Sequence, residues 1–407
     1  MWNQIHSNRR KSILLTLIMG GVLVGTGYAG GELTGTGLGA FGAALALVVW
    51  LVLALVSYYS GDKILLSSSG AKRVTHDDFP ALHNVTEEMA IASGFPRIPD
   101  VYVINDPSPN AFATGRSPKS ASVAVTSGLL TRLNRDELQG VIAHEISHIV
   151  NRDVLFMMML GIMLGAIVMI SDVFVRARFY GGGGRRSSSR GGGQAELLFL
   201  VIALVLIILA PLIARLIYFA VSRRREYLAD ACGAQFTRYP EGLASALEKI
   251  SAKPQQLKAA NRVTAPMYIV NPFAKIGRAA VGLFSTHPPT EQRVKLLRSM
   301  GGGASLAAYQ RAWQETMGFG RPLFTEKDLR SRLMTPKPAA APAAPALAPV
   351  KQAEPLMKRG DVGNFFWKKE GYGIVDCDCG VSFKIPPNFR SNAIFCTRCG
   401  KKHDLNK

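Results

Sequence analysis

The sequence has 407 residues, which is enough for two or three domains, so the chain can bury a core without a disulfide scaffold. Only 19% of the residues are charged and 48% are hydrophobic, which argues against an ordinary soluble protein and predicts that part of the chain lies in lipid. The formal net charge is +20, but the basic residues are spread over loops beside apolar segments, so nucleic acid is not an expected partner.

Four apolar segments have about the 20 residues that a helix needs to span a bilayer. They cover residues 13–30, 40–59, 154–173 and 197–221, so we expect a multi-pass membrane protein with about four transmembrane helices. A secretory signal is an alternative for the first segment, because three basic residues precede it. Its length and the closely following second segment favour a membrane helix.

Most of the basic residues in the loops favour one orientation of the chain in the membrane. By the positive-inside rule they place the soluble parts in the cytoplasm, at the inner membrane of the cell. The loop between the third and fourth segments opposes this orientation, because it carries five arginines. Within the first segment, Gly21 and Gly25 have the spacing that lets membrane helices pack closely, although the ordinary glycine content of such helices explains them equally well.

The soluble residues between the second and third segments have the pattern of a small α+β unit. Residues 78–93 are expected to form a helix, and residues 100–104 and 122–126 short strands. Asn134 and Glu137 have the spacing of a capping box, so a second helix is expected to start near Arg135 and to run through His148.

The composition divides the chain into four parts. Residues 1–60 hold two membrane helices, and residues 61–334 form the main domain, which a membrane hairpin at about 154–221 interrupts. Residues 335–355 are rich in Pro and Ala and are expected to form an extended linker. Residues 356–407 are a separate small module.

One short motif carries candidate chemistry. His144 and His148 are four residues apart, which places both imidazoles on one face of a helix, as two ligands of a tetrahedral zinc ion require. Glu145 would accept a proton from a zinc-activated water and pass it to the leaving amine. The neighbouring residues are apolar, so the helix is buried, and burying these polar groups without a metal would be costly.

A catalytic zinc also needs a third protein ligand. Glu226 is the best candidate, because it lies just after the fourth apolar segment, as His148 lies just before the third. An antiparallel membrane hairpin would bring both to the same membrane face. Asp230 is on the same helical face as Glu226 and can orient a ligand imidazole from behind, whereas an acidic pair that balances the preceding arginines is the simpler alternative.

Five sequence blocks resemble the HtpX-like membrane zinc peptidases, a family related to the zinc CaaX prenyl endopeptidases. They are PNAFATG at 109–115, VAVTSGLL at 123–130, HEISHIVNRD at 144–153, REYLAD at 225–230 and STHPPTEQR at 285–293. The resemblance implies a gluzincin-type α+β metalloprotease domain that cleaves membrane or misfolded proteins in quality control and the stress response. It implies His144, His148 and Glu226 as zinc ligands and Glu145 as the general base.

The same resemblance implies further roles around the zinc. Asn110, Ala111 and Phe112 would belong to an edge strand that pairs with an extended substrate peptide. His287, and with it Arg293, would stabilise the oxyanion, although a histidine before two prolines is also an ordinary turn residue. Asp153 would orient a ligand or carry a helix-end charge.

The C-terminal module departs from this family. Cys377, Cys379, Cys396 and Cys399 have the arrangement of a β-rich zinc ribbon, with Gly380 and Gly400 after each pair. We expect a structural zinc here in addition to the catalytic zinc, with His403 as an alternative ligand. Cysteines in this pattern indicate a reducing compartment. The ribbon is expected to recruit a substrate or a protein partner.

The sequence therefore predicts a mainly α integral membrane zinc endopeptidase whose partners are the lipid bilayer and polypeptide substrates. A prenyl-protein processing protease is the alternative enzyme, disfavoured because four membrane helices are few for an enclosed chamber. A catalytically inactive membrane scaffold is the alternative outside the enzymes.

Overall fold

The computed structural model describes residues 2–33, 37–154, 223–252, 267–270, 287–301, 303–318, 322–324, 354–389 and 391–405, together with positions 157, 164, 167, 168, 172, 212 and 329. The third and fourth apolar segments and the Pro/Ala-rich linker fall almost entirely outside these residues. Their predicted roles therefore stay predictions.

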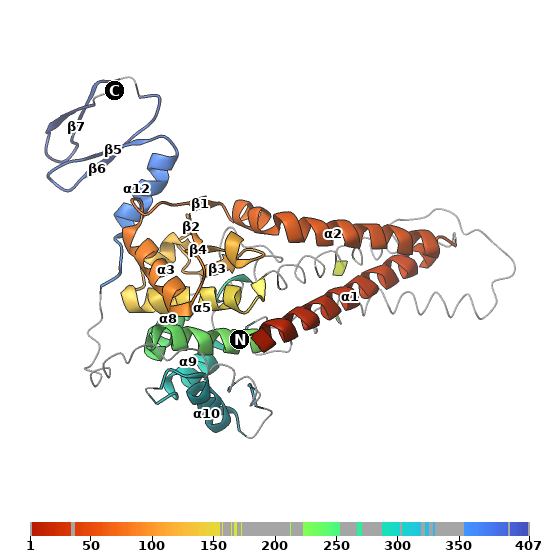
Figure 1. Cartoon of the computed structure of the whole chain (residues 1–407). Helices are drawn as coiled ribbons and strands as arrows, with labels where there is room; N and C mark the ends of the chain where they lie inside the picture. The colour runs from red at the N-terminus through yellow and green to blue at the C-terminus, as the bar shows by residue number, and fades with distance from the viewer. Residues whose placement is uncertain are drawn as a thin grey trace.

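The N-terminal residues form a helical hairpin that projects from the rest of the protein (Figure 1). Helix α1 spans Trp2–Leu33 and packs along α2, Gly39–Ser68. Among the described residues, α2 is the one helix long and apolar enough to cross a membrane, and only 11% of its most apolar window is buried. Exposed apolar surface on this scale needs lipid or another protein to cover it.

Glycines set the close approach of the two hairpin helices. A Cβ at Gly27 would lie 2.5 Å from the carbonyl oxygen of Gly42, and one at Gly20 would lie 2.6 Å from the Trp50 ring nitrogen. At Gly21 and Gly25 a Cβ would meet nothing within 4 Å of the described atoms. Among the described residues, Gly20 and Gly27 rather than Gly21 and Gly25 therefore mark the face of α1 that packs on α2.

A four-stranded mixed sheet forms the centre of the main domain. The strands are β1, Ala71–Arg73, β2, Asp100–Ile104, β3, Ala111–Thr114, and β4, Ser122–Thr126, in the order β1-β2-β4-β3. Strands β2 and β4 are parallel, and the other two pairs are antiparallel. The predicted strands at 100–104 and 122–126 are confirmed, and β3 forms one edge of the sheet.

Helices cover one face of this sheet. Helix α3, Pro80–Ser93, packs against α5, Arg135–Val150, and α5 contacts β3 and β4. Helix α8, Pro240–Ser251, crosses α5 at Gly140, where a Cβ would lie 2.6 Å from a backbone nitrogen of α8. Beyond α8 lie α9, Thr290–Arg298, and α10, Leu306–Met317 (Figure 1). The predicted helices near 78–93 and 135–148 are confirmed.

The opposite face of the sheet receives the end of α2. Leu65 and Leu66 pack in a small cluster with Phe112 of β3, Ala124 of β4 and Tyr268. Because side chains alternate across a strand, Phe112 and Ala124 point to this face while their neighbours point to α3 and α5. The end of α2 thus packs across this face of the sheet, from β1 to β3.

The C-terminal module begins with a helix that packs against the main domain. In α12, Arg359–Lys369, the side chains of Val362, Phe365 and Phe366 are buried in the main core, and the Phe365 ring lies 4.9 Å from that of Phe79. Two hairpins follow, formed by β5, Gly373–Asp376, with β6, Ser382–Ile385, and by β7, Ala393–Phe395, with β8, Lys402–Asp404. The residues before Gly373 thus anchor the hairpins to the main domain.

We expect Gly27→Ala to destabilise the α1–α2 hairpin, because its methyl group would collide with the Gly42 carbonyl and the Ala46 side chain. The cost should be about 1–3 kcal/mol. Gly25→Ala is the matched control and should be neutral or slightly stabilising, since Ala is the better helix former and no atom of α2 lies within 4 Å of the added Cβ. Thermal unfolding in detergent micelles measures both, and equal effects would contradict the packing.

Candidate metal centre

Helix α5 carries the candidate zinc motif and is fixed at its N-terminal end. The Asn134 side chain accepts a hydrogen bond from the Glu137 backbone N–H at 2.9 Å, and the Glu137 carboxylate accepts one from the Asn134 N–H at 3.0 Å, which is the predicted capping box. One turn apart on the inner face, the Nε2 atoms of His144 and His148 lie 3.2 Å from each other.

Glu226 reaches the same point from helical residues 223–237. Its carboxylate oxygens lie 3.5 Å from His148 Nε2 and 3.7 Å from His144 Nε2, and the three ligand atoms are all within 4.8 Å of one another. Two nitrogens bound to one tetrahedral zinc ion at about 2.0–2.1 Å are about 3.3 Å apart. The donor set and its spacing therefore fit zinc.

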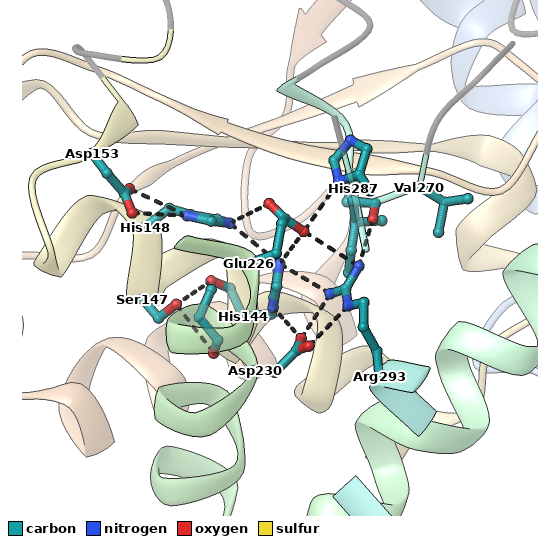
Figure 2. A network of polar contacts seen from close by, with 12 residues as sticks. His144, Ser147, His148, Asp153, Glu226, Asp230, Val270, His287 and Arg293 are labelled. Carbon is teal, nitrogen blue, oxygen red and sulfur yellow. Dashed lines mark hydrogen bonds and ion pairs between the residues drawn. The ribbon is translucent and has the colours of Figure 1, made fainter. Parts of the chain in front are cut away.

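Each imidazole is held from behind by a carboxylate (Figure 2). Asp230 Oδ1 lies 3.0 Å from His144 Nδ1, and Asp153 Oδ1 lies 3.2 Å from His148 Nδ1. Such contacts fix the ring orientation and leave Nε2 free for a metal, an arrangement typical of histidine ligands. The structure thus gives both Asp230 and Asp153 a contact that the sequence could only suggest.

Arg293 of α9 closes the network and is 1% exposed. Its guanidinium donates two hydrogen bonds to Asp230, at 2.7 and 2.8 Å, and lies 3.3 Å from Glu226 Oε2. His287 Nδ1 lies 3.1 Å from the same Glu226 oxygen (Figure 2). Both residues therefore lie within 3.3 Å of a candidate metal ligand, and the oxyanion role that the family resemblance implies for them stays a prediction.

Burial and charge move the pKa values in opposite directions across the centre. Burial raises the pKa of Glu145 to about 8 despite the nearby His148. For Glu226, burial also acts to raise the pKa, but the electrostatic effects of His287 and Arg293 and the hydrogen bonds from His148 and His287 hold the pKa well below its usual range. Burial lowers the pKa of His148, but Asp153 and Glu226 outweigh it, so the net pKa is well above the ordinary value.

A pocket opens beside this centre. It is lined by Ala113, Glu145, His148, Asp153, Val154, Met157, Arg225, Glu226 and Met267. The general-base candidate and two candidate metal ligands therefore reach one opening, whose remaining wall is largely apolar. Sequence patterns did not reveal Arg225, Met157 or Met267 as pocket residues, because no spacing rule connects them to the zinc motif.

Strand β3 borders the same pocket. The Ala113 backbone N–H donates to the Glu145 carboxylate, which places the edge of the sheet directly at the motif. Asn110 and Ala111 lie on this edge, whereas the Phe112 side chain is fully buried against Tyr268 on the other face. The Phe112 ring therefore does not face the pocket, and Ala113 is the β3 residue that lines it.

The four C-terminal cysteines come together between the two hairpins. The sulfur atoms of Cys377 and Cys399 lie 3.4 Å apart, as do those of Cys379 and Cys396, and all four form one group that could hold a metal ion. Four thiolates without an open position are typical of a structural zinc site. His403, the alternative ligand, lies on β8 and does not belong to this group of four.

We expect two truncations of the C-terminal module to differ in stability. A chain that ends at Glu370 keeps α12 and should lose one of two bound zinc ions with no change in unfolding temperature. A chain that ends at residue 353 also loses the Phe365 and Phe366 contacts and should lose at least about 3 kcal/mol of stability. Zinc analysis and thermal unfolding measure these effects, and equal stability of the two chains would contradict the packing of α12.

We expect zinc affinity at the α5 centre to decrease as the pH is lowered, because the raised pKa of His148 favours a proton on the ring that zinc must displace. The loss should approach about tenfold per pH unit below the raised pKa of His148. Competition with a chelating dye, in the chain that ends at Glu370, measures it. Asp153→Asn lowers the pKa of His148 and should flatten the dependence, and a pH-independent affinity would contradict this protonation state.

Comparison with known proteins agrees with this geometry. Residues 76–301 match the model of Peptidase family M48. Proteins named Protease HtpX homolog are 45% identical over 300 residues in Dictyoglomus turgidum, covering 74% of this chain and 95% of the relative, and 46% identical over 289 residues in Pyrococcus furiosus, covering 70% and 94%. The Dictyoglomus thermophilum homolog is 46% identical over 300 residues, with 74% and 95% covered.

One solved structure is also similar. The crystal structure of S. mikatae Ste24p has a TM-score of 0.41 and 19% sequence identity, and the match covers 73% of this chain and 67% of that chain. This likeness is too weak to carry an argument, so the assignment rests on the sequences. The expected resemblance to the HtpX-like peptidases is confirmed, and the chain belongs to Peptidase family M48.

Proposed function

We propose that this protein is a membrane-bound zinc endopeptidase that hydrolyses peptide bonds in membrane or misfolded proteins. The observation that carries the proposal is the convergence of His144, His148 and Glu226 at one point, with Glu145 beside them in the same pocket. The names of the relatives, Protease HtpX homolog, support the same activity.

Each side chain in the pocket has a defined task in this proposal. His144, His148 and Glu226 would hold the zinc ion, which would supply a Lewis acid to polarise the scissile carbonyl and acidify a water molecule. Glu145 accepts the proton of the attacking water and donates it to the leaving amine. Its pKa of about 8 suits a group that must both take and release a proton near neutrality, and a bound dication would lower that pKa.

The surrounding residues position the ligands. Asp230 and Asp153 orient the imidazoles of His144 and His148. Arg293 pairs with Asp230, and both Arg293 and His287 contact the same oxygen of Glu226. These contacts give His287 and Arg293 a positioning role through Glu226. Stabilisation of the oxyanion by His287 remains a proposal from the family resemblance, which its place beside Glu226 supports.

The substrate would bind as an extended chain along the side of β3 that faces away from β4. Edge strands bind peptides through main-chain hydrogen bonds, and the Asn110–Phe112 edge leads directly to Glu145. The zinc ribbon is proposed to recruit substrates or a partner protein beside this domain. Four membrane helices, with the pocket and the ribbon on the cytoplasmic side of the inner membrane, complete the proposal; the apolar hairpin and the basic loops support it.

We expect Glu145→Gln to lower the rate of casein hydrolysis by about 10²–10⁴-fold, because the amide cannot accept the proton of the attacking water. Zinc content and unfolding temperature should stay close to those of the native protein. Glu87→Gln, at an exposed position of α3, is the control and should retain full activity. Hydrolysis that persists in Glu145→Gln, or that resists a zinc chelator, would contradict the protease proposal.

A further inference from the structure

The outer edge of β3 carries the polar backbone groups of alternate residues. Antiparallel pairing places Phe112 opposite Ala124 and Ala111 opposite Val125, and the Asn110 carbonyl accepts a hydrogen bond from the Thr126 N–H on β4. Alternate residues therefore bond to β4, which turns the backbone groups of Ala111 and Ala113 outward. The Ala113 N–H meets Glu145, so these outward groups are the ones that a substrate strand would use.

A short segment of the same chain already occupies this edge. The Ile269 N–H donates to the Ala111 carbonyl at 3.0 Å, and the Asn110 side-chain amide donates to the Val270 carbonyl at 2.9 Å. The Asn110 side-chain oxygen accepts from the Ala111 N–H at 3.1 Å. The segment therefore takes the outward carbonyl of Ala111, as a paired strand would, and the Asn110 side chain takes the Ala111 N–H.

The segment also reaches the pocket and the metal centre. The Met267 side chain lines the pocket together with Glu145 and Glu226. Two residues further on, the Ile269 carbonyl accepts a hydrogen bond from Arg293 at 3.0 Å. A side chain in the pocket and a backbone along the edge strand are the two features by which an extended peptide would be held there.

We propose that Met267–Val270, termed the β3 strap, stands in for a substrate peptide on the edge of β3 and must move away before substrate can pair with Ala111. This inference rests on the proposed function, because it assumes that substrate binds along β3. The strap lowers apparent affinity, since only the fraction of molecules with an open edge can bind. The strap thereby excludes from the zinc pocket those polypeptides that bind too weakly to displace the strap.

Removal of one strap hydrogen bond tests the proposal. Ile269→Pro deletes the N–H that occupies the Ala111 carbonyl but keeps the carbonyl that Arg293 binds. Ile269→Val is the matched control, because it trims the buried side chain and keeps the N–H. With a casein-derived peptide, we expect Ile269→Pro to raise kcat/KM by roughly two- to tenfold, mainly through a lower KM, and Ile269→Val to match the native protein.

A loss of activity or of zinc in Ile269→Pro, with Ile269→Val unaffected, would overturn the strap and show that the segment supports the site. A gain of equal size in both variants would assign the effect to the side chain and would also overturn it. If the native protein and both variants fail to hydrolyse the peptide, the proposed function fails, and the strap fails with it.

A second measurement avoids any change in the strap. Zinc-loaded Glu145→Gln is mixed with saturating casein-derived peptide, and amide hydrogen exchange is followed in the residues 267–270. We expect exchange of the Ile269 amide to accelerate at least about tenfold while β4 stays protected, because the Ala111 carbonyl then bonds to the peptide. Unchanged or slower exchange with peptide bound would overturn the strap and leave the proposed protease activity standing.

Discussion

Charge balance in a buried site is the constraint on which this structure depends. Four carboxylates are buried around the two imidazoles of α5, those of Glu145, Asp153, Glu226 and Asp230. Arg225 and Arg293, also buried, compensate two of them. Uncompensated charge is costly in a protein interior, so a dication or two protons must balance the rest. The pKa values of His148 and Glu145 are both raised, which is the direction in which protons would balance this charge in place of a dication.

The arrangement of helices follows from this constraint. Asp230 is fully buried and orients His144, so it needs a cation of its own, and α9 delivers Arg293 for that purpose. Helix α9 is held by α8, which in turn crosses α5 closely at Gly140. The packing of α9 on α8, and of α8 on α5, therefore brings the Arg293 guanidinium to the Asp230 carboxylate. Truncation of Arg293 would leave that carboxylate unpaired in the core, which typically costs about 3–5 kcal/mol.

Local features were predictable from the sequence, and distant pairings were not. The capping box at Asn134 and the two histidines of α5 follow from spacing within one helix, and Glu226 followed from its place after an apolar segment. The pairing of Arg293 with Asp230 and the packing of Phe365 on Phe79 join residues separated by long stretches of chain, so no periodicity marks them. In α1 the small-residue spacing was ambiguous, because several glycine pairs share it and only the packing partner selects the true face.

Strand β3 contacts both the end of α2 and the β3 strap. Phe112 on β3 and Tyr268 in the strap pack edge to face, with ring centroids 5.2 Å apart, in the cluster that also holds Leu65 and Leu66 at the end of α2. Close-packed clusters shift between discrete arrangements rather than deform smoothly. If α2 crosses the bilayer, a change in its tilt acts on the same few side chains that hold the strap against β3. Access to the zinc pocket would then depend on the membrane as well as on the substrate, through contacts that the fold already contains.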